Sequence, residues 1–387
     1  MRDPEEKTAF GPGLDAAIDL ALAERRLVGT VVLVARDGAL VYARAAGFAD
    51  RAGARAVAED TIFRLASVTK PITTATLMAL VERGAVALSD PVTRFLPDFR
   101  PRMRNGREPV ITIAQLLTHS SGLGYRFLKR GGSYEALGIS DGLDQPGLSM
   151  AENLARLARA PLAFAPGAKW RYSLAIDVIG AVIEAASGMG FAEAVERFVT
   201  GPLALRDTAF RVTDPARLAV AYMGAAPEPR PMGDPEAVEL WSGEVRFAPS
   251  RILDPASYPS GGAGMAGTAP EILRFLETIR SGGGEILRPE TVALMMENHV
   301  RPDARTLGPG MGFGYGWAVL LDPVAAETPQ SPGTISWGGV YGHRWFIDPA
   351  ERLTVVALTN TAFEGMEGRF VTDVRDAIYE GLPALAG

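Results

Sequence analysis

The sequence predicts an α+β fold: an antiparallel sheet flanked by N- and C-terminal helices, plus a mostly helical inserted domain. Strand-forming runs are confined to the two ends of the chain, whereas 67–240 carries helical periodicity. An Asp-Gly turn between the first two runs is a strong signal for an antiparallel hairpin. We therefore expect a discontinuous sheet domain, 1–66 with 241–387, and a helical domain, 67–240, with a ligand site in the cleft between them.

The N-terminal elements are predicted from the spacing of apolar and strand-forming residues. Residues 14–26 carry apolar side chains at helical intervals. The runs 30–35 and 40–46 predict two strands, joined at Arg36-Asp37-Gly38.

The middle of the chain gives mainly helical signals. A helix over 68–83 closes on Gly84, and a longer one over 174–187 stops at Gly188. Thr112 and Gln115 form a capping box that opens a short helix. The glycine-rich 130–149 and the proline-rich 224–259 predict long loops.

The C-terminal part returns to strands. A capping box, Thr268 to Glu271, predicts a helix that ends at Gly282. Predicted elements then follow in order: strands near 314–321, 334–337, 344–347 and 353–358, and a terminal helix near 370–380.

Composition excludes several classes of protein. The net charge of −6, with no basic run, argues against a nucleic-acid partner. The absence of cysteine excludes disulfides, thiolate metal sites and a cysteine nucleophile. No apolar stretch approaches the roughly 20 residues of a membrane span, and the acidic start lacks the apolar segment of a secretory signal. We expect a cytoplasmic protein, and oligomeric state is left open.

Ser67 and Lys70 form the first candidate for chemistry. Side chains three apart at a helix start share one face, so the amine is expected beside the hydroxyl, with Ser67 at the N-cap. A serine hydroxyl is a weak nucleophile until a neighbouring base takes its proton. Only four of the 39 basic residues are lysines, which favours a role for the Lys70 amine itself. An ordinary N-cap serine with an exposed lysine is the alternative.

Two further segments complete the candidate site. Tyr172 lies just before the helix at 174, where its hydroxyl can relay a proton; a buried core tyrosine is the alternative. Trp337-Gly338-Gly339-Val340 places glycines where another molecule can approach the backbone, with a β-bulge as the alternative.

These three segments, with Leu116 to Leu123, resemble the class C β-lactamase superfamily of penicillin-binding serine hydrolases, and most closely its family VIII carboxylesterases. The resemblance implies Ser67 as nucleophile, Lys70 and Tyr172 as general base and acid, and the backbone N–H groups of Ser67 and Val340 as the oxyanion hole. It implies no metal and no cofactor.

Two departures from the β-lactamase pattern indicate esters. Leu174 stands where β-lactamases usually have an asparagine that binds the substrate amide. Trp337 replaces the lysine of Lys-Thr-Gly and offers an apolar wall, so Trp337, Gly338, Gly339 and Leu174 are expected to contact the substrate. The resemblance thus implies hydrolysis of short-chain acyl esters through an acyl-enzyme on Ser67.

Alternatives remain open. The same fold serves β-lactamases, D-amino peptidases or amidases and acyl transferases, and a non-catalytic binder would keep the shape without the reaction.

Three other patterns favour structural interpretations. Gly138-Ile-Ser140-Asp-Gly142 fits the nucleophile elbow of α/β-hydrolases but lacks its flanking strand and helix, which indicates a loop. His119 is expected to be a helix-end or core residue. Gly308 to Gly316 predicts a glycine-rich strand rather than a nucleotide loop.

Overall fold

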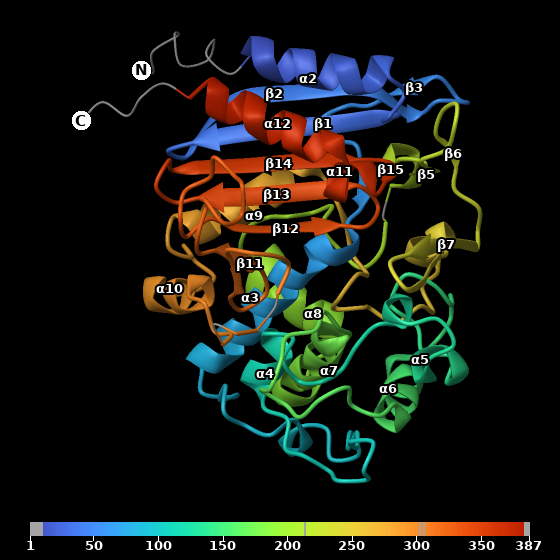
Figure 1. The fold of residues 1–387 in the computed structure, drawn as a ribbon, viewed down its shortest axis with the longest axis vertical. Helices are drawn as coiled ribbons and strands as arrows, with labels where there is room; N and C mark the ends of the chain where they lie inside the picture. Colours follow the sequence, from blue (N-terminus) through green and yellow to red (C-terminus); the bar gives the residue numbers. More distant parts are fainter. Residues whose placement is uncertain (1–10, 213, 302, 305, 383–387) are drawn as a thin grey trace.

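The fold is built around one eight-stranded sheet, in a computed structural model that describes residues 11–382 except 213, 302 and 305. The strand order is β10-β11-β12-β13-β14-β1-β2-β3, and every neighbouring pair is antiparallel (Figure 1). The predicted fold class is confirmed. The strands are β1 (Gly29–Arg36), β2 (Ala39–Asp50), β3 (Arg55–Ala56), β10 (Met311–Phe313), β11 (Ala318–Leu320), β12 (Ile335–Gly339), β13 (His343–Asp348) and β14 (Leu353–Thr359).

Helices cover both faces of this sheet. On one face α2 (Gly11–Ala23) lies against α12 (Arg369–Glu380), and Figure 1 shows the two side by side near both chain ends. Their apolar stripes pack on the alternate side chains of β1 and β14 in a single core. On the other face α9 (Ala269–Arg280) contacts β14 and β1. Every residue of β1 is therefore buried, as a strand covered on both faces requires.

The remaining helices gather below the sheet in Figure 1, apart from α10 and α11. Among them α3 is buried over nearly its whole length and contacts α7, because both contribute to one large core. The helices are α3 (Thr69–Glu82), α4 (Ile113–Leu117), α5 (Ser133–Ala136), α6 (Met150–Arg159), α7 (Ala175–Ser187), α8 (Phe191–Val195), α10 (Pro289–Met296) and α11 (Glu364–Glu367).

Short elements join these parts. Three small sheets pair β4 with β9, β5 with both β15 and β6, and β7 with β8. Their strands are β4 (Phe63–Arg64), β5 (Tyr222–Met223), β6 (Arg230–Pro231), β7 (Glu236–Leu240), β8 (Gly243–Phe247), β9 (Ala266–Gly267) and β15 (Thr361–Ala362). The single turns of helix are η1 (Ala66–Val68), η2 (Val92–Arg94), η3 (Arg126–Leu128), η4 (Glu196–Thr200), η5 (Pro215–Arg217) and η6 (Pro249–Leu253).

Most helix signals hold in the structure. The capping box of Thr112 and Gln115 is present in both directions, and Gly188 closes α7 in the left-handed conformation. The capping box predicted for α9 is wrong, although the helix is there. Thr268 makes no side-chain cap, and the Glu271 carboxylate accepts hydrogen bonds from the backbone of Asp207 and the hydroxyl of Thr208 instead of from the N–H of Thr268.

Four of the predicted ranges differ from the structure. The first helix spans Gly11–Ala23 rather than 14–26. Of the strand predicted over 314–321 only Ala318–Leu320 is strand, since the residues before it form the turn from β10 to β11, with Gly316 at φ +96°. Only Met311–Phe313 of the glycine-rich 308–316 is strand. The loop predicted over 224–259 contains the β7–β8 hairpin.

The predicted domain boundary at 240 falls in the turn of that hairpin, and β8 packs against η3 of the helical part. The division into 1–66 with 241–387 and 67–240 stays a prediction.

In the described part of the chain, no single helix is long and apolar enough to cross a membrane. Only one bent pair of helices, Ala175–Ser187 with Phe191–Thr200 at 83°, meets that criterion by length and composition.

Candidate active site

Ser67 lies in η1, the single turn of helix that leads from β4 into α3. The predicted N-cap role is wrong: the N-cap of α3 is Val68, and the Ser67 side chain makes no capping bond. The residue before it, Ala66, has φ +45°, a conformation that non-glycine residues rarely adopt. Such backbone strain persists only where the surroundings fix it, and here β12 packs against the turn.

Lys70 lies in the first turn of α3 with its side chain fully buried. Its Nζ donates hydrogen bonds to the Ser67 hydroxyl at 2.9 Å and to the Gly262 carbonyl at 2.6 Å. One turn further, the Thr73 hydroxyl donates to the Gly261 carbonyl at 2.9 Å. The 261–262 turn is thus fixed to α3 at two points, which orients the amine toward Ser67.

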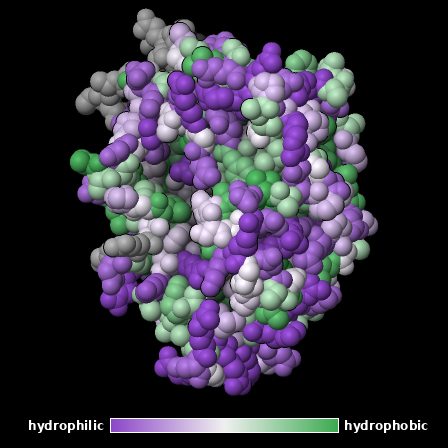
Figure 2. Space-filling model, turned by 45° about the vertical axis from the view of Figure 1, so that its right-hand side comes forward, coloured by the Kyte–Doolittle hydropathy of each residue, from purple (hydrophilic) through white to green (hydrophobic). Residues whose placement is uncertain are grey.

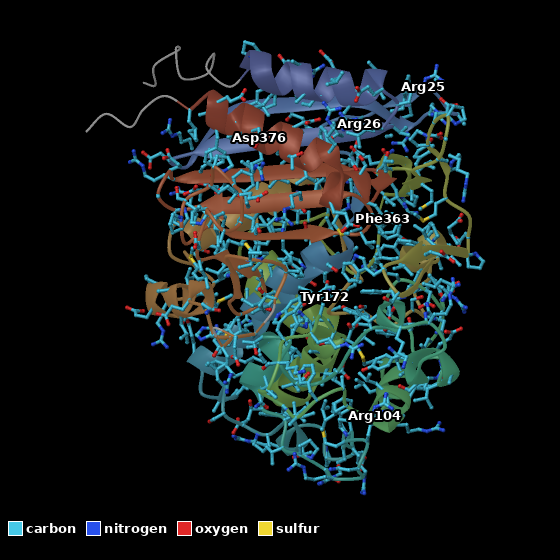
Figure 3. The ribbon with its side chains drawn as sticks, in the orientation of Figure 1. Arg25, Arg26, Arg104, Tyr172, Phe363 and Asp376 are labelled. Carbon is cyan, nitrogen blue, oxygen red and sulfur yellow. The ribbon has the colours of Figure 1, made fainter. Side chains whose placement is uncertain are left out.

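Tyr172 reaches the same point from the segment before α7. Its hydroxyl lies 2.6 Å from the Ser67 Oγ, and the Lys70 Nζ stands 4.8 Å from the centre of its ring. Figure 3 shows Tyr172 at the middle of the molecule, between the sheet and the helices below it. The predicted hydroxyl, amine and phenol therefore meet, with the hydroxyl between two groups that can exchange its proton.

His119 packs edge-on against the Tyr172 ring, with centroids 5.0 Å apart. Burial, with the nearby Lys70 charge, holds the pKa of His119 well below its usual range. Its Nδ1 lies 3.0 Å from the Ser173 hydroxyl. His119 is therefore a neutral core residue that supports the tyrosine, in keeping with the sequence interpretation.

Backbone N–H groups beside Ser67 can bind a developing oxyanion. Within the described residues, neither the N–H of Ser67 nor that of Val340 has a hydrogen-bond acceptor, and both residues line the same cavity. A Cβ on Gly339 would lie 2.4 Å from the Leu65 carbonyl oxygen. Only glycine allows the end of β12 to approach the η1 turn this closely, which places Val340 near Ser67.

The cavity at this site has a volume of about 460 Å³, within the range of about 300–1,000 Å³ that is common for small-molecule sites. Figure 2 shows the surface hollowed near mid-height, with apolar side chains around the hollow. Most of the lining is apolar and much of it aromatic: Tyr125, Phe127, Leu143, Trp170, Tyr172, Trp241 and Trp337.

The predicted substrate contacts divide into two groups. Trp337 and Gly338 line the cavity. Leu174 does not line the cavity. Its side chain is fully buried and packs in the core, so the expected contact between Leu174 and the substrate is wrong. Gly339 packs against the η1 turn instead of lining the cavity, and its contribution is the close approach described above.

Two further residues that could be mistaken for catalytic ones, Ser140 of the Gly138–Gly142 pattern and His343, have structural roles. Ser140 is fully buried in a loop, where its hydroxyl donates to Asp144 at 2.5 Å. His343 is also buried, and its Nε2 donates to the Arg64 carbonyl at 2.7 Å. Burial lowers the pKa of His343 to about 4, so it is neutral. In the described part of the chain, no group of three or more His, Asp or Glu side chains is arranged to hold a metal ion.

Sequence reasoning missed the group behind Lys70. Asp177 is buried on α7, accepts a hydrogen bond from Ser260 at 2.6 Å, and lies beneath Gly262. Burial raises its pKa, opposed by the Ser260 bond and the Lys70 charge. The signal was present: Asp177 lies among apolar residues in the first turn of α7, and acids are almost never fully buried without a partner.

A β-lactamase fold with a serine, a lysine and a tyrosine in one cleft defines the class of protein to which this chain belongs, and the sequence comparison gives the same class. Residues 14–379 match the Beta-lactamase family, and the chain belongs to that family.

Individual relatives are more specific. The chain is 55% identical over 371 residues to esterase EstB of Burkholderia gladioli, covering 95% of this chain and 94% of that one. It is 28% identical over 398 residues to a monacolin J acid methylbutanoyltransferase of Aspergillus terreus, covering 89% of each. Among solved structures it is similar to EstCE1, a hydrolase with promiscuous acyltransferase activity, with a TM-score of 0.94 and 46% identity over 96% of this chain and 99% of that one.

Proposed function

We propose that this protein is a serine carboxylesterase that hydrolyses short-chain acyl esters through an acyl-enzyme on Ser67. The observation that carries the proposal is the Ser67 hydroxyl itself. It lies within hydrogen-bond distance of both the Lys70 amine and the Tyr172 phenol, at the wall of a small-molecule cavity.

In the first half-reaction Ser67 attacks the ester carbonyl and its proton passes to Tyr172. The Lys70 amine, beside both Ser67 and the Tyr172 ring, stabilises the negative charge that the phenol carries while it acts as base. The N–H groups of Ser67 and Val340 bind the oxyanion of the tetrahedral intermediate, an interaction worth about 3 kcal/mol per donor. Tyr172 then returns the proton to the departing alcohol.

In the second half-reaction a water molecule attacks the acyl-enzyme. Tyr172 takes the proton of that water and passes it back to Ser67 as the carboxylic acid leaves. The same three side chains therefore serve both steps, which gives ping-pong kinetics.

The lining of the cavity favours neutral esters over β-lactams. Trp337 stands where a β-lactamase presents a cation to the substrate carboxylate, and its ring lies 5.3 Å from that of Tyr172. An indole offers no charge to an anion but packs well against an acyl or alkyl group. The names of the relatives agree with this choice, since EstB is an esterase and EstCE1 a hydrolase.

Acyl transfer is the second candidate function. Trp170, Trp241 and Trp337 give the cavity an apolar lining in which an alcohol can compete with water for the acyl group. EstCE1 is described with acyltransferase activity, and a second relative is a methylbutanoyltransferase. A non-catalytic binder is disfavoured because Ser67, Lys70 and Tyr172 meet in reactive geometry.

One set of assays separates these functions. We expect rapid hydrolysis of p-nitrophenyl acetate and butyrate, and slow turnover of nitrocefin and of the matched p-nitroanilide. The Ser67→Ala variant serves as control. Fast nitrocefin opening with poor ester hydrolysis would overturn the assignment. Vinyl butyrate with added benzyl alcohol measures transfer, since the transferase yields benzyl butyrate in preference to butyric acid. The cytoplasmic location stays a prediction.

A further inference from the structure

Asp141 is a buried carboxyl at the wall of the catalytic cavity that the mechanism does not use. Its side chain is 1% exposed, yet it lines the same cavity as Ser67. Among the other charged residues of the lining, Arg171 and Glu367 are partly or fully exposed, whereas Arg344, whose pKa burial lowers to about 10, donates to the Ser336 hydroxyl at 3.0 Å. Asp141 is the buried carboxyl of this lining.

Only half of this carboxyl is hydrogen-bonded. The Oδ1 accepts from the backbone N–H of Arg126 at 3.1 Å, whereas Oδ2 is buried with no partner. A buried polar atom without a hydrogen bond costs about 1–3 kcal/mol, and such atoms are rare in native proteins. Because Asp141 lines the cavity, a ligand group that reaches this oxygen would supply the missing hydrogen bond.

Asp144, three residues further along the same loop, provides the contrast. Its Oδ2 pairs with the Arg126 guanidinium at 2.9 Å, and its Oδ1 accepts from Ser140 at 2.5 Å. Both oxygens are satisfied, and Asp144 does not line the cavity. The loop is thus able to satisfy a buried carboxylate completely, and it does so for the acid that faces away from the cavity.

Hydrogen bonds and close packing hold the loop that carries Asp141 on both sides of that residue. Asn153 accepts from the backbone N–H of Ser140 at 2.9 Å and donates to its carbonyl at 3.0 Å. Gly142 has φ +84°, and a Cβ there would lie 2.3 Å from the Ser260 hydroxyl. A side chain held this firmly is pre-organised, so binding costs little conformational entropy.

We propose that Asp141 is a specificity-determining residue whose free oxygen hydrogen-bonds a hydroxyl group of the substrate, so that hydroxylated esters react faster than their deoxy analogues. The inference rests on the proposed esterase function and names its substrate class. It adds a polar contact to a cavity that is otherwise mostly apolar.

A hydroxyl fits this position better than an ammonium group. The Arg126 guanidinium lies beside the loop and opposes a second cation. Burial, with Asp144 and Asp177 nearby, raises the pKa of Asp141 to about 7 against the Arg126 charge, so both protonation states are populated near neutral pH. A hydroxyl donates to the carboxylate and accepts from the acid, whereas an ammonium group binds only the carboxylate.

The test compares kcat/KM for matched substrates. The acyl-side pair is p-nitrophenyl butyrate with p-nitrophenyl 3-hydroxybutyrate. The alcohol-side pairs are the butyrates of ethanol with ethylene glycol and of butanol with 1,4-butanediol, followed by acid release. In the unchanged protein the hydroxylated member of at least one pair is favoured, by about tenfold for one well-formed hydrogen bond.

Two variants test whether Asp141 causes that preference for hydroxylated substrates. Asp141→Leu abolishes the ratio, while Asp141→Asn keeps part of it, because its amide still donates to a hydroxyl oxygen. Asp144→Asn is the matched control: it alters the same buried network without touching the cavity, so the ratio stays unchanged while thermal stability falls.

Three results overturn the inference. They are a ratio near one for every pair in the unchanged protein, an unaltered ratio in Asp141→Leu, and a stronger preference for the 3-aminobutyrate ester than for the 3-hydroxybutyrate ester. The first holds even if the leucine variant does not fold. Turnover of plain p-nitrophenyl butyrate separates the two proposals: its absence refutes the esterase function, whereas turnover without discrimination refutes only the role of Asp141.

Discussion

Ser67 and Ser140 both occur in sequence motifs of hydrolytic serines, yet their surroundings differ. Each hydroxyl is hydrogen-bonded to two other residues. Ser67 bonds a lysine and a tyrosine and lines a cavity, whereas Ser140 bonds Asp144 and the Gly142 backbone and is fully buried. A nucleophile needs both a group that takes its proton and room for a carbonyl carbon, and only Ser67 has both.

The largest effect expected from this contrast is that of Ser67→Ala. Loss of the nucleophile lowers kcat for p-nitrophenyl butyrate by at least about 10⁴-fold, in line with removal of nucleophiles elsewhere. Because Ser67 makes no capping bond, thermal unfolding changes little. Steady-state rates and circular dichroism measure the two quantities. Near-normal turnover in a folded Ser67→Ala protein would show that Ser67 is not the nucleophile.

The next effect is that of Tyr172→Phe, which keeps the ring packing and deletes the phenol hydroxyl. Without this proton carrier kcat falls by about 10²–10⁴-fold, the usual contribution of general acid–base catalysis. Tyr134→Phe is the matched control, since its hydroxyl accepts from Gly124 and the residue does not line the cavity. Equal losses in both variants would contradict the assigned role of Tyr172.

His343 supports the segment that carries Ser67. Its ring hydrogen-bonds the Arg64 carbonyl, just before η1. Its pKa is about 4 in the folded state against 6.5 for a free histidine. The unfolded chain binds the proton first, so stability is lost as the pH falls from about 6.5 to 4. The loss amounts to about 3 kcal/mol.

The measurement is urea unfolding at pH 8 and pH 4 for the unchanged protein and for His343→Gln. The glutamine variant is expected to start from a lower stability at pH 8, and to lose about 3 kcal/mol less between the two pH values than the unchanged protein. Identical slopes against pH would show that His343 is not held neutral.

The smallest effect on turnover is that of Ser140→Ala. The change leaves the Gly142 N–H and one Asp144 oxygen without a partner, which costs about 1–3 kcal/mol of stability. Ester hydrolysis stays close to that of the unchanged protein, because Ser140 has no access to the cavity. Ser149→Ala, which removes the N-cap of α6, is a control of similar expected stability cost, about 1 kcal/mol. A large loss of kcat in Ser140→Ala alone would reverse the roles of the two serines.

Local patterns predicted the elements whose signals are themselves local. The i, i+3 spacing of Ser67 and Lys70 brings their side chains together, and Gly188 ends α7 as its position indicates. Tyr172 was identified through a family resemblance, because 105 residues separate it from Ser67 and no local rule joins them.

The predictions that failed concern residues whose surroundings are set by contacts between distant segments. Leu174 follows Tyr172 closely, yet as the N-cap residue of α7 it is buried in the core. The Glu271 carboxylate binds the backbone of Asp207 in place of its own helix start. Asp141 gave no signal at all, since its importance comes from the cavity wall that the fold assembles around it.

Active-site labelling tests the central claim most directly. The protein is treated with a fluorophosphonate, digested, and the modified peptide is located by mass spectrometry. We predict one adduct, on the peptide that contains Ser67, with labelling strongly slowed in Tyr172→Phe. An adduct on Ser140, or no adduct in a folded protein, would contradict the account.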